Sequence, residues 1–170
     1  MMRQHPRFVR DHNRSLILRL IKDRPGISRS EIKAEVGLTE AAISRITREL
    51  IDAHLLDEGD EIVEAASRPG RRNIGLSVEP QGAFTLAACL TLYEKRLSLI
   101  NLEGQSLASC GLTNVMKRSG QGLVDGLVKE AKRIIERSGA SRDRLLGMAV
   151  VSAGAIDYHR GAMTASSLPN

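Results

Sequence analysis

Apolar residues recur with a helical period through the first fifty residues of the chain. Four of them form one stripe of a first helix: Leu16, Ile17, Leu20 and Ile21. Pro25-Gly26 is expected to stop this helix. Ser28 then begins a short second helix as its N-cap, because Glu31 follows three residues later, which is the spacing of a capping box. Gly37 ends that helix at a position suited to positive φ.

A third helix is predicted over residues 40–54, with Thr39 as its N-cap. Its core face is formed by apolar residues at helical spacing: Ile43, Ile46, Leu50 and Ile51. The opposite face carries small, hydroxyl or Arg side chains: Ala41, Ala42, Ser44, Arg45, Thr47 and Arg48. Small residues let a helix approach a major groove closely, and Arg can bond two acceptors on a guanine edge. Taken alone, the pattern fits a solvated amphipathic helix equally well.

The order of these elements distinguishes the two interpretations. A helix, a short capped helix, a tight turn and a third helix with an Arg-bearing outer face make a helix-turn-helix. Beyond it, Glu58-Gly59-Asp60 is expected to form a tight turn between two short strands, which would be a wing. We therefore expect a winged helix-turn-helix domain over residues 1–66 that binds double-stranded DNA.

The charge of the chain is distributed unevenly along its length. Residues 1–50 hold 11 Lys or Arg residues against 6 Asp or Glu, in a chain of net charge +5. After an acidic cluster, Arg68, Arg71 and Arg72 flank a Pro-Gly pair in a predicted linker over residues 67–80. Such a slim basic strip can enter a narrow minor groove, where the negative potential favours Arg. A linker that is basic by chance explains it too, and both can hold together.

From Phe84 the pattern changes to strands. A mostly apolar run over 84–92 is followed by two strands within 95–113 around a turn at Glu103-Gly104. A helix comes next, with a stripe of apolar residues and Gly139 as its stop: Leu123, Leu127, Ala131, Ile134 and Ile135. A buried strand with a Gly-rich exit is expected within 145–157. The second half, residues 81–170, is therefore predicted to be an α/β domain with a mixed sheet.

The remaining chemistry-bearing residues indicate no enzyme. Cys89 and Cys110 match no metal motif and suggest no disulfide framework, and the four His residues lack partners at ligand spacing. Asp157 could orient a ligand, although an Asp at a strand end more often caps a turn. We expect no catalytic residue, cofactor or metal. No targeting segment or membrane span is visible, which indicates a cytoplasmic protein.

From about Asn13 to Asn170, the chain resembles the regulators of the ROK family (repressor, open reading frame, kinase). The strongest likeness is ISRSEIKAEVGLTEAAISRITREL at 27–50, which is similar to the helix-turn-helix of that family. PGRR at 69–72 is similar to its linker signature. GMAVVSAGAID at 147–157 is similar to a strand and turn that end in Pro-Gly-x-Val-Asp, with Ala153 in place of the Pro, and SSLPN at 166–170 is like the segment that follows.

The resemblance implies a transcriptional regulator of carbohydrate genes, most often a repressor, which forms a homo-oligomer and responds to a sugar or sugar phosphate. The C-terminal half would be the first lobe of an actin-like α/β domain of the sugar-kinase type, left incomplete at Asn170, and we expect a fragment. Kinases of the family carry an Asp-x-Gly-Gly-Thr phosphate loop. The corresponding residues 88–94 contain neither Asp nor Gly, so kinase activity is not expected.

Two alternatives remain open from the sequence. The winged helix could bind another protein instead of DNA, or the α/β half could be a vestigial sugar-kinase lobe. Under the main hypothesis, contacts to an operator are expected from two groups of residues. Those of the helix-turn-helix are Ser28, Arg29, Thr39, Ala41, Ala42, Ser44, Arg45 and Arg48. Those of the basic strip are Arg68, Arg71 and Arg72.

Overall fold

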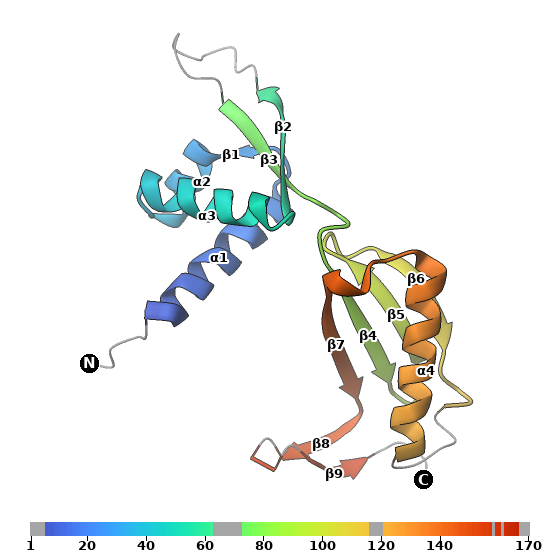
Figure 1. The fold of residues 1–170 in the computed structure, drawn as a ribbon. Coiled ribbons are helices and arrows are strands. Elements are labelled where there is room, and N and C mark those ends of the chain that lie inside the picture. The colour runs from blue at the N-terminus through green and yellow to red at the C-terminus, as the bar shows by residue number, and fades with distance from the viewer. Residues whose placement is uncertain (1–5, 63–72, 116–120, 158, 161, 167–170) are drawn as a thin grey trace. The chain divides into compact units, whose positions relative to one another are not determined.

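The structure is a computed structural model that describes residues 6–62, 73–115, 121–157, 159–160 and 162–166 (Figure 1). The chain divides into two compact units, Met1–Gly82 and Ala83–Asn170, and each is described by itself. No helix in the described ranges is both long enough and apolar enough to cross a bilayer.

The first unit combines three helices with a small antiparallel sheet. Its elements in chain order are α1 (Pro6–Asp23), β1 (Ile27–Ser28), α2 (Arg29–Val36), α3 (Glu40–Asp52), β2 (Leu56–Ile62) and β3 (Asn73–Val78). The strands lie in the order β1-β3-β2. Figure 1 shows the three helices gathered beside this sheet, with β2 and β3 extending together as a hairpin. This is the winged helix-turn-helix expected from the sequence.

The predicted caps of α2 and the predicted N-cap of α3 are confirmed in atomic detail, whereas α3 ends at Asp52 and not at residue 54. Ser28 caps α2 in a complete capping box with Glu31, and Gly37 ends that helix in the left-handed region with φ 65°. Thr39 caps α3 by accepting a hydrogen bond from the backbone N–H of Ala42. Because only about three residues separate α2 from α3, the turn fixes the direction in which α3 leaves.

The wing differs from the sequence-based prediction. The prediction of a tight turn at Glu58-Gly59-Asp60 was wrong. β2 runs through these residues, with a register irregularity between Glu58 and Glu61. Its partner is β3, which begins only at Asn73. The second strand of the wing thus lies inside the segment that we expected to be a linker, 67–80, and the first unit extends to Gly82.

The core of the first unit is aliphatic and joins all of its elements. Six large side chains from both helices and strands are at most 1% exposed: Ile17, Ile21, Ile32, Ile43, Leu56 and Leu76. Burial of each Leu or Ile side chain contributes about 1.5–3 kcal/mol of transfer free energy. The helices are therefore held on the sheet mainly by apolar packing.

The second unit is a mixed α/β layer. Its elements are β4 (Phe84–Leu90), β5 (Lys95–Asn101), β6 (Ser106–Gly111), α4 (Gln121–Ser138), a short 3₁₀ turn (Arg142–Arg144), β7 (Leu145–Ser152), β8 (Gly154–Asp157) and β9 (Ala162–Ser166). The main sheet has the order β6-β5-β4-β7, with β7 parallel to β4 and the other pairs antiparallel. β8 and β9 form a separate hairpin. The mixed sheet predicted from the sequence is confirmed.

The helix α4 covers one face of the sheet through its contacts with β5 and β6. The core between them contains mainly aliphatic side chains, which include Leu86, Ala88, Leu97, Leu99, Ala131 and Ile134. Gly139 ends α4 with φ 71°, as its position in the sequence predicted.

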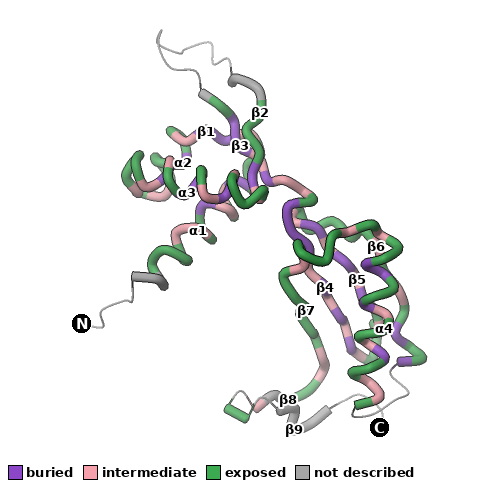
Figure 2. Tube along the Cα trace, in the orientation of Figure 1, coloured by how far each residue is buried: buried purple, intermediate pink, exposed green. Residues whose placement is uncertain are grey.

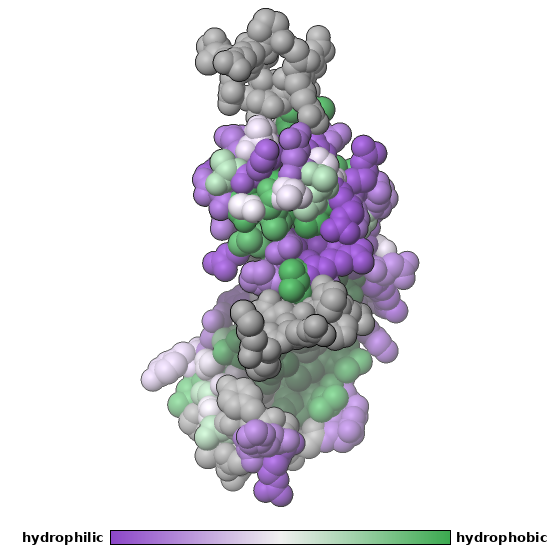
Figure 3. All heavy atoms as spheres, turned by 90° about the vertical axis from the view of Figure 1, so that its left-hand side faces the viewer, coloured by the Kyte–Doolittle hydropathy of each residue, from purple (hydrophilic) through white to green (hydrophobic). Residues whose placement is uncertain are grey.

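The strand β7 departs from expectation. We predicted a buried strand, but none of its residues is buried, and Leu146, Val150 and Val151 are 75%, 54% and 58% exposed. Figure 2 draws most of β7 in the colour of exposed residues, and Figure 3 shows apolar residues open on the side of this unit that faces the viewer. The physical reason is that α4 packs on β5 and β6, at the other end of the sheet.

Candidate nucleic-acid interface

The outer face of α3 is the candidate interface. Arg45, Arg48 and Ala41 are exposed, while Ala42 and Ser44 are half-buried. Among the side chains that the structure describes, none forms an ion pair with either Arg45 or Arg48. Two guanidinium groups on a face of otherwise small side chains are therefore available to an external anion. Exposed guanidinium groups beside short side chains are the features by which a helix can read base edges in a major groove.

One residue of the predicted outer face lies on the inner one. Thr47 is 0% exposed, because it follows Ile43 by four residues and precedes Leu50 by three, which places it on the core stripe. Its hydroxyl donates to the backbone oxygen of Ser44 at 3.2 Å and accepts from Nε of Arg29 at 3.0 Å. The spacing could have revealed this position, but its polar side chain led us to assign it to the surface.

Ser28, which we listed among the DNA contacts, is nearly buried at 2% exposure. Its backbone N–H donates to Oε2 of Glu31 at 2.8 Å, and its hydroxyl donates to the same oxygen at 2.7 Å. These two hydrogen bonds lower the pKa of Glu31. The hydroxyl of Ser28 is therefore used within the cap of α2.

Arg29 also lies inside a network. Its side chain is 23% exposed, and it contacts α3 through Thr47 and the wing strand β2 through an ion pair with Glu58 at 2.6 Å. Arg29 thus differs from Arg45 and Arg48, although the sequence placed all three together.

The helix α3 is anchored to α1 by charge. Glu49 on α3 accepts hydrogen bonds from Arg14 and from Arg10, the latter at 3.1 Å. The Arg14 guanidinium lowers the pKa of the Glu49 carboxyl, with a smaller contribution from the charge of Arg10. This link could not be predicted from the sequence because the partners are 35 and 39 residues apart.

Arg68, Arg71 and Arg72 lie outside the described residues. Ile62 at the end of β2 pairs with Asn73 at the start of β3. Residues 63–72 therefore connect the two strands of the wing rather than the two units of the chain.

In the described part of the second unit, two features that the sequence singled out as candidates for a ligand site form turns. Asp157 accepts hydrogen bonds from the backbone N–H groups of His159 and Arg160, so it caps the turn after β8. At the position of the kinase phosphate loop, β4 ends and Thr91 donates its N–H to the carbonyl of Glu94 at 2.8 Å in a tight turn.

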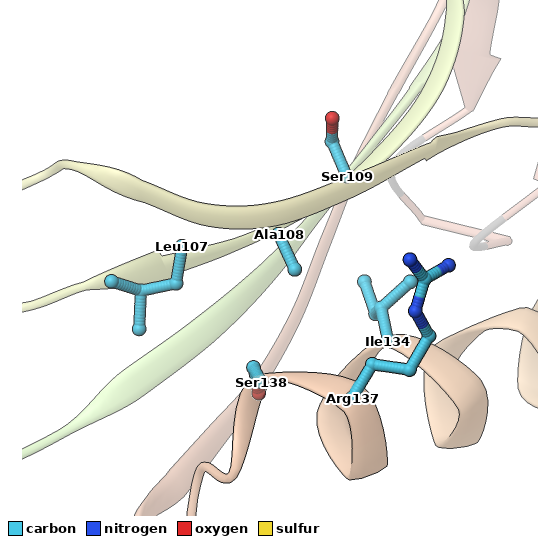
Figure 4. Close-up of a pocket in the computed structure, with 6 residues that line it drawn as sticks. All are labelled: Leu107, Ala108, Ser109, Ile134, Arg137 and Ser138. Atoms are coloured by element: carbon cyan, nitrogen blue, oxygen red, sulfur yellow. The ribbon is translucent and has the colours of Figure 1, made fainter.

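A shallow hollow of about 250 Å³ lies between β6 and α4. Figure 4 shows Ala108 and Ile134 pointing into it and Ser109 pointing away from the helix. It is smaller than the roughly 300–1,000 Å³ of typical ligand pockets. Arg137 and Ser138 are the polar residues of its helix side. We assign it no function.

Comparison with known proteins agrees with this architecture. A family profile described as winged helix-turn-helix DNA-binding matches residues 10–57. The DNA-binding transcriptional repressor Mlc of Escherichia coli (strain K12) is 28% identical over 153 residues, which cover 90% of this chain and 37% of that protein. The DNA-binding transcriptional dual regulator NagC of the same strain is 27% identical over 91% of this chain and 37% of its own length. A putative xylose repressor of Caldicellulosiruptor sp. (strain Rt8B.4) is 23% identical over 92% of this chain.

A crystal structure gives the same result for the fold. The structure of a ROK-family transcriptional regulator, described as a homolog of the Mlc protein of E. coli, superposes with a TM-score of 0.66 at 27% identity, over 95% of this chain and 40% of that one. The chain thus spans little more than a third of the length of the curated relatives. In sequence and in fold it is similar, over nearly all of its residues, to the N-terminal part of the ROK-family transcriptional regulators, which confirms the resemblance found in its motifs.

Proposed function

We propose that this chain is the DNA-binding part of a sequence-specific transcriptional regulator. The observation that supports it most is the outer face of α3, where Arg45 and Arg48 are exposed beside small residues on a helix whose other side is locked into the core. The names of the similar proteins Mlc and NagC describe DNA-binding transcriptional regulators, which agrees with this proposal.

In the proposed mode, α3 enters a major groove. The N-cap of α3 and its first turns approach the base edges, because the side chains there are short: Thr39, Ala41, Ala42 and Ser44. Arg45 and Arg48 then reach guanine edges or phosphate oxygens, where a guanidinium can donate two parallel hydrogen bonds. The anchoring of Glu49 by Arg10 and Arg14 keeps α3 from tilting as it docks.

The wing supplies the second contact. Arg68, Arg71 and Arg72 lie in the connection between β2 and β3, and we propose that they follow the DNA backbone into an adjacent minor groove, where a narrow groove favours Arg. A homo-oligomer would then place two copies of α3 in successive major grooves of a pseudo-palindrome, with half-sites about one helical turn apart or a multiple of that.

The biological role that we propose is repression of carbohydrate genes in the cytoplasm, relieved by a sugar or sugar phosphate. Its support is the naming of similar proteins as a transcriptional repressor, Mlc, and as a putative xylose repressor. We propose no kinase activity for the chain, because residues 88–94 form a strand end and a tight turn without glycine. A phosphate loop needs glycines so that its backbone N–H groups can approach the phosphate oxygens.

The test is duplex binding by the 170-residue chain. Repeated selection from a random duplex pool would yield a preferred sequence, and fluorescence anisotropy would compare it with random duplex over a range of salt concentrations. We expect tighter binding to the selected duplex and a logarithmic salt slope of about −0.9 for each phosphate contacted. Absence of salt-dependent binding to either duplex would contradict the proposal and favour the protein-interaction alternative.

A further inference from the structure

Arg29, the first residue of α2, joins three elements of the winged unit with one side chain. Its Nε donates to the Thr47 hydroxyl of α3 at 3.0 Å, and its Nη2 donates to Glu58 of β2 at 2.6 Å. The side chain is 23% exposed, while that of Glu58 is 43% exposed. The two bonds leave Arg29 between α3 and β2 rather than on the outer surface of either.

The hydrogen bonds form a directed chain. Glu58 accepts from the Arg29 guanidinium, Nε of Arg29 donates to Thr47, and the hydroxyl of Thr47 donates to the backbone oxygen of Ser44. Each donor in this series therefore has an acceptor, and the Thr47 hydroxyl acts as both. Thr47 is fully buried, so its bond to Arg29 is shielded from water. A hydrogen bond in such a low-dielectric place is electrostatically stronger than one in water.

This series of hydrogen bonds ends in the part of α3 that the proposed function uses. Ser44 is the acceptor at one end, and Thr47 lies between Arg45 and Arg48 in sequence. A shift of Thr47 relative to β2 would move these two guanidinium groups relative to the wing. A guanidinium suits this task because its planar fork donates in two fixed directions, whereas the ammonium of Lys is a single point charge.

We infer that Arg29 is a positioning residue, which holds the outer face of α3 in register with the wing through Thr47 and Glu58 and does not itself contact DNA. The inference rests on the proposed function and assigns Arg29 a role different from the direct contact expected from the sequence. Operator recognition then depends on Arg29 through geometry and not through its charge.

The binding test uses Arg29→Ala, Arg29→Lys and, as a matched control, Arg24→Ala. The control removes another Arg of the same unit from an ion pair, the one with Glu35 at 2.8 Å, which does not involve α3. We expect both Arg29 variants to lose roughly tenfold in affinity for the selected duplex, the size of one well-made base contact. Affinity for random duplex and the salt slope should stay near those of the unmodified chain, and the control should keep its preference.

Two results would overturn the inference. If Arg29→Lys keeps the full preference for the selected duplex, a positive charge is sufficient and the fork is not needed. If Arg29→Ala loses affinity equally for both duplexes and its salt slope falls by about 0.9, Arg29 contacts a phosphate directly. Thr47→Val, which removes the acceptor and keeps the shape, should reproduce the loss of preference.

A measurement on the free chain separates this inference from the proposed function. Amide hydrogen exchange over residues 44–50 should be faster in Arg29→Lys than in Arg24→Ala, because only the former loosens α3. If the unmodified chain binds no duplex but this difference is present, the proposed function fails and the positioning role stands. If exchange is the same in both variants, the positioning role is overturned whatever the DNA result.

Discussion

The backbone oxygen of Gly26 lies only 2.9 Å from the point that a Cβ atom on Gly75 would occupy. Gly75 is buried on β3, and the backbone N–H of Gly26 donates to the oxygen of the neighbouring Leu76 at 2.9 Å. Gly26 itself has φ 85°. The turn that ends α1 is therefore packed backbone against backbone on the wing sheet, which connects the helices and the wing without any intervening side chain.

Replacement of Gly75 by Ala should destabilise the first unit. The added methyl group would displace the backbone of Gly26, and overpacking of this kind costs about 1–3 kcal/mol. Gly59 on the paired strand β2 is a matched control, because a Cβ atom there would meet its nearest neighbour at 3.7 Å. Urea unfolding of both variants checks the prediction. Equal midpoints for Gly75→Ala and Gly59→Ala would show that the turn can yield.

Replacement of Glu49 by Gln should weaken the attachment of α3 to α1 in a pH-dependent way. Arg14 lowers the pKa of the Glu49 carboxyl in the folded chain below its ordinary value of 4.5. A carboxyl whose pKa is lowered by folding stabilises the folded chain at pH values above its ordinary pKa. This stabilisation is lost as the pH falls through the lowered pKa. The urea midpoint of Glu49→Gln should therefore lie below that of the unmodified chain at pH 7, and the gap should close in acid.

Glu35→Gln serves as the comparison for Glu49→Gln. It removes a carboxylate that is 51% exposed and that, among the described residues, pairs with one Arg, Arg24, whereas Glu49 is 27% exposed and pairs with two Arg residues. Exposed single pairs contribute little, so its effect at pH 7 should be the smaller one. A larger effect for Glu35→Gln would contradict the anchoring role of Glu49.

Replacement of Asp57 by Asn should have the opposite pH dependence. A hydrogen bond with Glu79, together with burial and the negative charge of Glu79, raises the pKa of Asp57 above 3.8. The pair of Asp57 and Glu79 stabilises the folded chain while it holds a proton. This stability is lost as the pH rises through the raised pKa of Asp57. Relative to the unmodified chain, the urea midpoint of Asp57→Asn should therefore rise from pH 4 upward, and the difference should then become constant.

Asp52→Asn provides the control for loss of one negative charge, because Asp52 is exposed at the end of α3 in the same unit. The two variants are compared by urea unfolding over the same pH series. A difference between Asp57→Asn and the unmodified chain that does not change with pH would show that the carboxyls of Asp57 and Glu79 do not share a proton.

Local signals in the sequence predicted local structure well. Ser28 with Glu31, Gly37 and Thr39 each act within four residues, so their capping roles could be inferred without knowledge of the fold. The stripe on α4 and its stop at Gly139 are of the same kind. The outer positions of Arg45 and Arg48 followed from the helical period alone.

The features that could not be predicted depend on distant partners. The pairing of β2 with β3 joins Ile62 to Asn73 across ten intervening residues, and the sequence offered a nearer turn at Glu58-Gly59-Asp60. The burial of Thr47 is stabilised by Arg29, eighteen residues away. The exposure of β7 depends on which part of the sheet α4 covers, and an apolar strand carries no sign of that.

The exposed strand β7 leads to a prediction about association. It carries no charged residue, and within the described residues no strand pairs with its outer edge. Long apolar edges without charge are prone to pair with another chain. We expect the chain to self-associate with concentration, and Val150→Lys/Val151→Lys to shift this association by roughly tenfold in concentration. Sedimentation velocity measures it, with Leu107→Lys on β6 as the control; a sedimentation coefficient that stays at the monomer value would contradict the prediction.

Replacement of Arg45 or Arg48 by Ala tests the proposed interface itself. Each should reduce affinity for the selected duplex by about 1–3 kcal/mol if the guanidinium bonds a guanine edge, and the loss should be specific to the base pair that it reads. Arg19→Ala on α1 is the matched control, because its side chain is 83% exposed and pairs only loosely with Asp23 at 3.9 Å. Titration of the three variants by fluorescence anisotropy at fixed salt gives the comparison.

Since neither Arg45 nor Arg48 pairs with a described side chain, their removal should leave the urea midpoint unchanged. Binding losses therefore report on the duplex contact and not on folding, and affinities equal to that of Arg19→Ala would remove the outer face of α3 from the interface.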